Sequence, residues 1–344
     1  MKKIVCMVMA VVMALGLTAC GNGSNPSAGS NGEVQQLTLA HTLDAEHPVN
    51  LGAEYFAKRL EELSSGTMVT TVHPNSGLGG EDEVTEMQSY SDTVTFSVPS
   101  GCALQKFCPA TYAADFYFQF ENYDQVWAFY DGEYGDYIKD SLDGTGLVVT
   151  YFWDNGFRNL TTKNTPVHTT ADLKGLKVRV MGAETHLAFW NAIGAAATPI
   201  AFSEVYSALQ QGTVEGQENP VFNIYGSRFQ EVQHYLTLTR HVHDVSPFII
   251  SGTAWNSWTD EQRGWVEQAS KEAGDYMRAK SIEMEDEILQ KLQDAGMEVI
   301  ELTDAERQTF VDAVKDVPAQ FAEKMGDEAY ELYQKCIAEA QQAG

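Results

Sequence analysis

Two stretches in the middle of the chain decide the fold. Residues 172–181 read DLKGLKVRVM, and residues 198–220 read TPIAFSEVYSALQQGTVEGQENP. Alternating apolar side chains in the first stretch predict a strand, with Arg179 on the side opposite to the apolar residues. In the second, Ser203 is a favourable N-cap for a helix that would end at Gly212. Strand and helix in this succession are typical of α/β folds.

The same alternation extends toward both ends of the chain. Val214 to Gln217 predicts a further strand, and Asn219-Pro220 predicts the N-cap and first position of the helix that follows it. On the N-terminal side we expect strands over 37–41, 68–72, 93–98 and 147–152, and helices over 50–63 and 81–90.

One helix is predicted to be unusually long. Thr259 and Gln262 form a plausible capping box for a helix that we expect to run unbroken from Asp260 to about Ala295, with Gly296 as its terminator. At 1.5 Å per residue such a helix is roughly 50 Å long, which exceeds the width of a typical single domain. We therefore expect it to bridge two lobes.

The N-terminus predicts export. Two lysines precede an apolar run over residues 4–17, as in a signal peptide, and the run is too short for a stable transmembrane helix. The residues LTAC, which end at Cys20, resemble the bacterial lipobox, in which the cysteine is lipidated. We expect residues 1–19 to be a lipoprotein signal peptide and 20–35 to be a flexible tether. An ordinary signal peptide that contains a cysteine is the alternative.

Composition excludes one class of partner. The 344 residues carry 22 basic and 48 acidic side chains, a net charge of −26. Nucleic acids need a basic face, so we expect no nucleic-acid partner. Cys102 and Cys108 leave three readings open, namely a disulfide, two free buried thiols or half of a metal site.

Motifs for catalysis are missing. The chain has no G-x-S-x-G, H-E-x-x-H, Walker loop or C-x-x-C sequence. His241 and His243 could be metal ligands, but no third ligand is suggested nearby. We therefore expect no enzyme, no cofactor and no metal.

Two arginines are candidates for anion binding. Arg158 lies among turn formers in WDNGFRNLT, residues 153–161, and Arg179 lies within the predicted strand. A planar guanidinium can hold a carboxylate with two charge-assisted hydrogen bonds, and Asn219 would stand at a helix N-terminus, which favours anions. Alternatively each arginine pairs with an internal acid and Asn219 only caps its helix. Spacing alone favours this second interpretation.

Six segments, in order, carry a family resemblance. They are LTLAHTLDAEHP (37–48), HPNSGLGGEDE (73–83), YFWDNGFRNLTT (151–162), DLKGLKVRVM (172–181), TPIAFSEVYSALQQGTVEGQENP (198–220) and RFQEVQHYLTLTRHVH (228–243). Through them the chain, from about residue 36 to 335, resembles the extracytoplasmic solute-binding proteins of tripartite ATP-independent periplasmic (TRAP) transporters, the DctP family.

This resemblance implies a two-lobed, periplasmic-binding-protein-like α/β fold with crossing segments and a long bridging helix. The first lobe would comprise 36–155 with about 245–284, and the second 156–244 with about 285–344. The ligand would be buried between them.

It also implies a ligand site. Arg179 resembles the family's main carboxylate clamp, and the residues that match its other contacts are Arg158 (second cation), Asn219 (amide donor), Phe202 (aromatic wall), and Glu81 with His41 or Thr42 (the ligand's far end). His241 matches a position near the lobe crossing and is either structural or ligand-facing.

Departures from the family pattern lie in the first lobe. Residues 90–92 (YSD) replace a glycine-containing turn, and residues 97–100 (SVPS) lack the acidic contact of sialic-acid-type members. These departures put the ligand's identity in doubt but not the carboxylate anchor.

The resemblance implies a binding protein that captures a small organic acid outside the cytoplasmic membrane, or in the periplasm, and delivers it to a TRAP permease. Together with the lipobox at Cys20, it predicts that this binding protein is lipid-anchored. Glu81 and His41 favour a hydroxylated acid such as a uronate or aldonate. A C4-dicarboxylate or 2-oxo acid is the alternative ligand, and a sensory protein for a receptor kinase is the alternative function.

Overall fold

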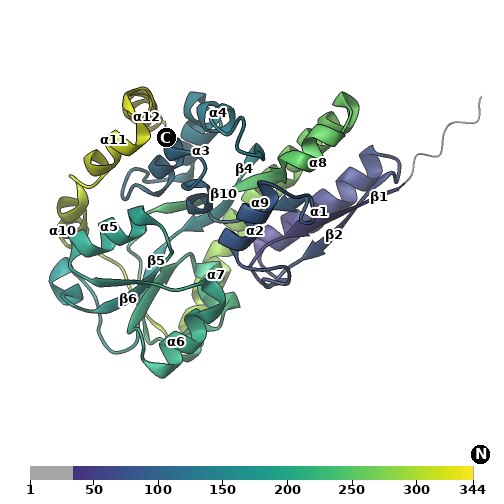
Figure 1. The fold of residues 1–344 in the computed structure, drawn as a ribbon. Helices are drawn as coiled ribbons and strands as arrows, with labels where there is room; N and C mark the ends of the chain where they lie inside the picture. The colour runs from purple at the N-terminus through teal and green to yellow at the C-terminus, as the bar shows by residue number, and fades with distance from the viewer. Residues whose placement is uncertain (1–33, 344) are drawn as a thin grey trace, which may run out of the picture. The chain divides into compact units, whose positions relative to one another are not determined.

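The computed structural model describes residues 34–343, and these residues form two β-sheets with helices packed around them (Figure 1). The first sheet has five strands in the order β2-β1-β3-β10-β4. Its strands are β1 (Gln35–Ala40), β2 (Met68–His73), β3 (Phe96–Ser97), β4 (Leu147–Phe157) and β10 (His243–Ser251). The predicted signal peptide, Cys20 and nearly all of the predicted tether lie outside the described residues.

The second sheet has six strands in the order β11-β9-β5-β8-β6-β7. Its strands are β5 (Asn159–Thr162), β6 (Lys177–Val180), β7 (Ala196–Pro199), β8 (Gly216–Asn219), β9 (Tyr235–Thr237) and β11 (Glu298–Ile300). β6 pairs in parallel with both β7 and β8, whereas β5 pairs antiparallel with β8 and β9. Two mixed sheets among many helices confirm the predicted two-lobed α/β class.

The chain crosses between the sheets at Arg158. This residue alone separates β4, in the first sheet, from β5, in the second. The return crossing, residues 238–242, lies beside it, because the N–H of Arg158 donates to the carbonyl of Val242 at 2.8 Å and the N–H of His241 to the carbonyl of Arg158 at 3.3 Å. The crossing strands are thus joined by backbone hydrogen bonds at the point where they change sheets.

The long helix α9 (Asp260–Asp294) confirms the prediction from the sequence. It begins at the expected capping box, in which the N–H of Gln262 donates to the hydroxyl of Thr259. Its first half packs on α1 (Pro48–Leu63) and β4, where Met277 belongs to one cluster of buried hydrophobic side chains. Its last turns pack on α7 (Val221–Gly226), where Leu292 belongs to a second such cluster. α9 therefore joins two hydrophobic cores.

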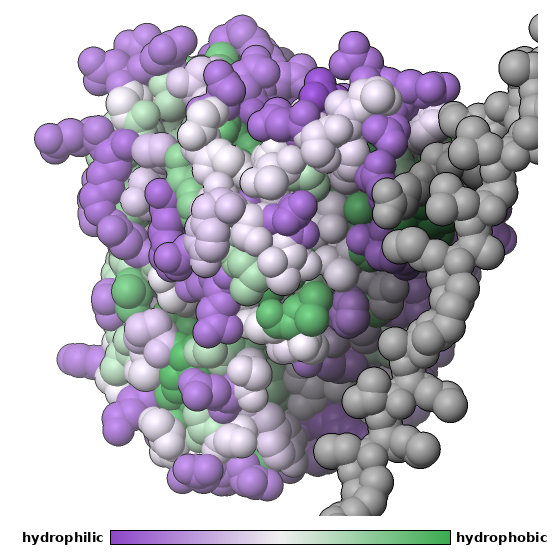
Figure 2. Space-filling model, turned by 45° about the vertical axis from the view of Figure 1, so that its right-hand side comes forward, coloured by the Kyte–Doolittle hydropathy of each residue, from purple (hydrophilic) through white to green (hydrophobic). Residues whose placement is uncertain are grey.

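Other helices complete the layers, and they are α2 (Glu81–Gln88), α3 (Tyr123–Tyr130), α4 (Glu133–Asp140), α5 (Glu184–Ile193), α6 (Val205–Gln211), α8 (Gly252–Ser257), α10 (Asp304–Val314), α11 (Ala322–Met325) and α12 (Asp327–Ala340). The C-terminal helix α12 contacts α3 and α4. Figure 2 shows a face on which hydrophilic side chains predominate and apolar ones form only small groups. Among the helices of residues 34–343, none combines the length and apolarity that a membrane span requires.

Two predicted helix starts are wrong. The segment Phe202–Glu204 is a short 3₁₀ turn, and α6 begins after it at Val205, so Ser203 is not its N-cap. Asn219 is the last residue of β8 and pairs with Asn159, while Pro220 is the N-cap of α7. The backbone of Asn219 is held by pairing with β5, so its side chain does not cap α7 as the sequence suggested.

Candidate functional site

A cavity of about 580 Å³ lies where the two sheets meet the crossing strands. The first sheet's side contributes Thr42, Glu81 and Ser100, and the second contributes Arg179, Phe202 and Asn219. Arg158 and Asp244 line it from the crossing region. Five of the six predicted ligand contacts therefore line one cavity.

His41 is the exception. It borders a smaller neighbouring cavity together with Thr42 and Glu81, and its Nε2 lies 3.1 Å from Oδ1 of Asn50. Burial lowers its pKa, despite the hydrogen bond to Asn50. Of the two alternatives that the sequence offered at this position, Thr42 is the one that reaches the larger cavity.

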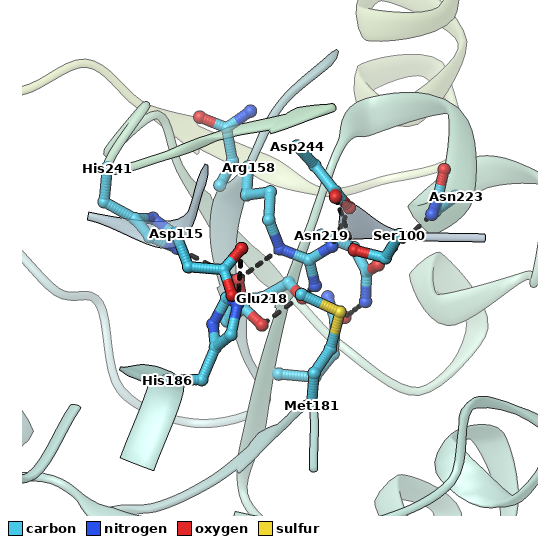
Figure 3. Close-up of polar contacts among 12 residues, drawn as sticks. Ser100, Asp115, Arg158, Met181, His186, Glu218, Asn219, Asn223, His241 and Asp244 are labelled. Atoms are coloured by element: carbon cyan, nitrogen blue, oxygen red, sulfur yellow. Dashed lines mark hydrogen bonds and ion pairs between the residues drawn. The ribbon is translucent and has the colours of Figure 1, made fainter. Parts of the chain in front are cut away.

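Arg158 is fully engaged by acids of its own chain (Figure 3). Its Nε donates to Oε2 of Glu218 at 2.6 Å, its Nη2 donates to Oε1 of Glu218 at 2.9 Å, and its Nη1 donates to Oδ2 of Asp244 at 2.6 Å. Burial alone would lower the pKa of Arg158, but the charges of Glu218 and Asp244 outweigh burial and raise it. The internal ion-pair interpretation therefore describes this arginine.

Arg179 has no such partner. Its Nε donates to the carbonyl of Ile200 at 2.8 Å, and its Nη1 is buried without a hydrogen-bond partner. No carboxylate of residues 34–343 forms an ion pair with it. Burial, together with the like charge of Arg158, lowers its pKa to about 10. It is still a cation at neutral pH, and a bound anion would compensate its charge.

The ring of Phe202 lies 5.9 Å from the guanidinium carbon of Arg179, within the range of a cation–π contact. Strand β6 places Arg179 between β7 and β8, opposite Thr198 and Gln217. A strand that is paired on both sides fixes the direction of this side chain better than a loop would.

The remainder of the cavity carries acidic oxygens. The hydroxyl of Thr42 donates to Oε1 of Glu81 at 3.0 Å, and burial with the nearby charge of Asp244 raises the pKa of Glu81 to about 7. Asp244 accepts from the hydroxyl of Ser100 at 2.5 Å and from the amide of Asn155 at 2.9 Å. Hydroxyl groups of a ligand would find acceptors here.

Several lining residues were not predicted from the sequence, namely Asn155, Asp244, Ser100, Asn223, Met181 and Cys102. Asn155 and Asp244 had a readable signal, since each is a polar residue in a fully buried part of its strand. The Sγ of Cys102 lies 3.8 Å from Sδ of Met181, and Cys102 and Cys108 are both free thiols in this structure.

The histidine pair does not form a metal site. Nε2 of His241 lies 3.0 Å from Oε2 of Glu218, and Nε2 of His243 lies 2.7 Å from Oδ1 of Asp154. Each ring is buried, and its Nε2 is hydrogen-bonded to a different carboxylate. Within the described part of the chain, no group of three or more His, Cys, Asp or Glu residues could hold a metal ion.

Comparisons with known proteins agree with this architecture. The model of DctP, the bacterial extracellular solute-binding protein family 7, matches residues 39–325. The 2,3-diketo-L-gulonate-binding periplasmic protein of Escherichia coli is 31% identical over 293 residues, which cover 83% of this chain and 88% of that protein. The C4-dicarboxylate-binding periplasmic protein of Rhodobacter capsulatus is 31% identical over 308 residues, 88% of this chain and 91% of its own.

Solved structures show the same fold. The sugar acid binding protein of Advenella mimigardefordensis in complex with galactonate superposes with a TM-score of 0.87 at 27% identity, over 90% of this chain and 100% of that one. A TRAP periplasmic solute-binding protein of Sulfurospirillum deleyianum with bound succinate gives a TM-score of 0.83 at 31% identity, over 88% and 99%. The chain belongs to the DctP family of solute-binding proteins, which serve TRAP transporters.

Proposed function

We propose that this protein binds the carboxylate of a small organic acid at Arg179 and delivers the acid to a TRAP permease. One observation carries the proposal. Arg179 is a buried cation that lines the cavity, and among residues 34–343 it has no acidic partner and its Nη1 donor is free. A buried charge without a partner is costly, and a ligand carboxylate would supply that partner with charge-assisted hydrogen bonds.

A hydroxylated acid suits the rest of the cavity better than a second carboxylate does. The charge of Arg158 is already matched by Glu218 and Asp244, and Glu81 adds a further acidic oxygen. We therefore favour a sugar acid, a uronate or an aldonate. Relatives with bound galactonate, D-erythronate and β-D-galacturonate support this class.

The second candidate ligand is a C4-dicarboxylate or a 2-oxo acid. Two relatives with bound succinate, and relatives named for C4-dicarboxylate binding, support it. A further candidate function is a sensory binding protein for a receptor kinase, which would use the same fold and site. Loss of uptake of the bound acid on deletion of the protein would favour transport over sensing.

We also propose three further properties of the protein. The protein is not an enzyme, in line with a family that serves transport. It is exported and held on the outer face of the cytoplasmic membrane by a lipid on Cys20. Its lobes divide the chain into 36–155 with about 245–284, and 156–244 with about 285–344.

A thermal-shift screen over organic acids tests the ligand class. When its free concentration is 100 times its dissociation constant, a ligand stabilises the folded protein by roughly 2.7 kcal/mol. A true ligand therefore raises the melting temperature by several degrees. We expect Arg179→Ala to abolish the shift. Arg59→Ala, which removes an arginine that pairs with Glu272 away from the cavity, serves as the control and should keep it. Retained affinity in Arg179→Ala would refute the clamp assignment.

A further inference from the structure

A directed chain of hydrogen bonds begins at the N-terminus of α1. His47 is the N-cap of this helix, and its Nδ1 accepts from the backbone N–H of Val49 at 3.1 Å. Because Nδ1 is an acceptor, the ring proton is on Nε2. Nε2 lies 2.9 Å from Oδ1 of Asn223, so His47 donates to that amide.

The chain continues through four more buried side chains to a backbone carbonyl. Its successive bonds are Asn223 Nδ2 to Asn219 Oδ1 (3.3 Å), Asn219 Nδ2 to Gln217 Oε1 (2.5 Å), Gln217 Nε2 to Thr161 Oγ1 (2.9 Å), Thr161 Oγ1 to Gln233 Oε1 (3.3 Å) and Gln233 Nε2 to the carbonyl of Val232 (3.0 Å). Every side chain in this series is at most 4% exposed.

The hydrogen-bond series starts and ends at backbone groups that each have only one possible role. The N–H of Val49 can only donate, and the carbonyl of Val232 can only accept. Each amide between them therefore has a single orientation. Reversing Asn223 or Asn219 would place like groups against each other at both neighbours. Gln233 must donate to the carbonyl of Val232, so it accepts the single hydroxyl proton of Thr161, and Gln217 must then donate to that hydroxyl. A buried network of this kind is costly to leave half satisfied.

The orientation matters at Asn219, which lines the ligand cavity. Its Oδ1 accepts from Asn223 and one Nδ2 hydrogen goes to Gln217, so the second Nδ2 hydrogen is the donor that it has left. An N–H suits the oxygen of a carboxylate, whereas a reversed amide would offer a lone pair and repel it. We propose that His47 is a positioning residue that, through Asn223, holds the amide of Asn219 as a donor toward the bound acid.

This inference rests on the proposed carboxylate site, but its first link is a feature of the fold. His47 and Asn223 are 176 positions apart, and they join α1, which packs on β2 of the first sheet, to α7, which follows β8 of the second. Burial lowers the pKa of His47 to about 4, which keeps the ring neutral and its tautomer defined at neutral pH. The link therefore requires α1 and α7 to lie together.

Two substitutions at one position separate positioning from capping. In His47→Gln, the amide nitrogen stands as many bonds from Cβ as the imidazole Nε2, so the donation to Asn223 survives while the cap is weakened. In His47→Asn, the amide oxygen takes the place of Nδ1, so the cap survives while the donation is lost. We expect both variants to melt lower than the wild type, His47→Asn because the buried Oδ1 of Asn223 loses its donor and His47→Gln because the cap is weakened. Only His47→Asn should bind acids about tenfold more weakly, whereas His47→Gln should bind as the wild type does.

Two kinds of measurement test this role, one that needs no ligand and one that measures ligand affinity. Nitrogen-15 NMR reads the tautomer of His47 and the side-chain amide signals of Asn219, and calorimetry gives affinities for galactonate, galacturonate, erythronate and succinate. An Nδ1–H tautomer, or Asn219 signals that are equally unchanged in both variants, would overturn the positioning role. Should wild-type protein bind none of these acids, the proposed ligand class fails, and the NMR result still decides the hydrogen-bond chain by itself.

Discussion

Arg158, which lines the cavity, is joined to Glu218 by three hydrogen bonds. The guanidinium makes two hydrogen bonds to the carboxylate, at 2.6 and 2.9 Å, and Nη2 also donates to the backbone carbonyl of Glu218 at 2.6 Å. Both side chains are at most 1% exposed. Burial would raise the pKa of Glu218, but the charge of Arg158 holds it well below its ordinary range. This pair anchors strand β8, and hence Asn219, to the crossing point of the chain.

Loss of one partner in this pair should be strongly destabilising. Glu218→Gln leaves the buried charge of Arg158 with Asp244 alone, and removal of one member of a buried pair typically costs about 3–5 kcal/mol. Urea unfolding at neutral pH measures the change. Glu272→Gln is the matched control, because Glu272 pairs with Arg59 at the same 2.6 Å but is about one-third exposed. We expect the control to alter stability far less, and equal losses in the two variants would contradict the assignment.

Glu81 should make acid binding depend on pH. Its pKa of about 7 lies above the ordinary 4.5, so its carboxyl is largely neutral below pH 7 and charged above it. A negative charge in the cavity repels an anion, and affinity for galactonate should therefore fall, by about tenfold, as pH rises from about 5.5 to about 8.5. Calorimetry at both pH values measures the fall.

Glu81→Gln provides the control for that dependence. Its side chain cannot ionise but can still accept from Thr42, so its affinity should stay level across the same range. A variant that keeps the full pH dependence would assign the effect to another group. The same linkage predicts that Glu81 makes the fold less stable as pH rises from 4.5 through 7, because the folded state holds the proton more tightly there.

The candidate site was predictable to the extent that local pattern determines it. The alternation in KVRV correctly placed Arg179 in a strand, and five predicted contacts share one cavity. The partners of Arg158 were not predictable, because Glu218 and Asp244 lie 60 and 86 positions away among 48 acids. No local spacing identifies which of those acids is nearby in space.

The fold shows the same division. The capping box at its start and Gly296 after its end predicted α9 nearly to the residue, since both are local signals. Asn219 was misassigned because a residue before proline suits both a strand end and a cap, and only the pairing with Asn159 decides between them. At His41, β1 has already ended at Ala40, so strand alternation no longer determines which side chain faces the cavity.

The buried neutral histidine at α1 should weaken the fold in acid. The pKa of His47 is about 4 in the folded protein and 6.5 in the unfolded chain. The unfolded chain therefore binds more protons between these values, and stability present above pH 6.5 is lost as pH falls toward 4. We expect a contribution on the order of 3 kcal/mol to that loss. His47→Asn keeps the cap and cannot ionise, so its urea-unfolding free energy should decline less between about pH 7 and about pH 4.5. An unchanged decline would show that other groups account for it.

Two glycines of α9 should respond in opposite ways to the same substitution. A Cβ on Gly274 would lie 2.5 Å from Cδ1 of Tyr151 and 2.8 Å from Cδ1 of Trp153, side chains of β4 against which the helix packs. A Cβ on Gly264 would meet nothing within 4 Å. Alanine is favoured over glycine in a helix by about 1 kcal/mol, so Gly264→Ala should stabilise the protein by up to that amount. Gly274→Ala gains the same propensity, but the clash with β4 should cost about 1–3 kcal/mol and leave it destabilised. Thermal and urea unfolding of both variants measures the difference, and stabilisation by Gly274→Ala would show that α9 and β4 are not packed as closely as this geometry requires.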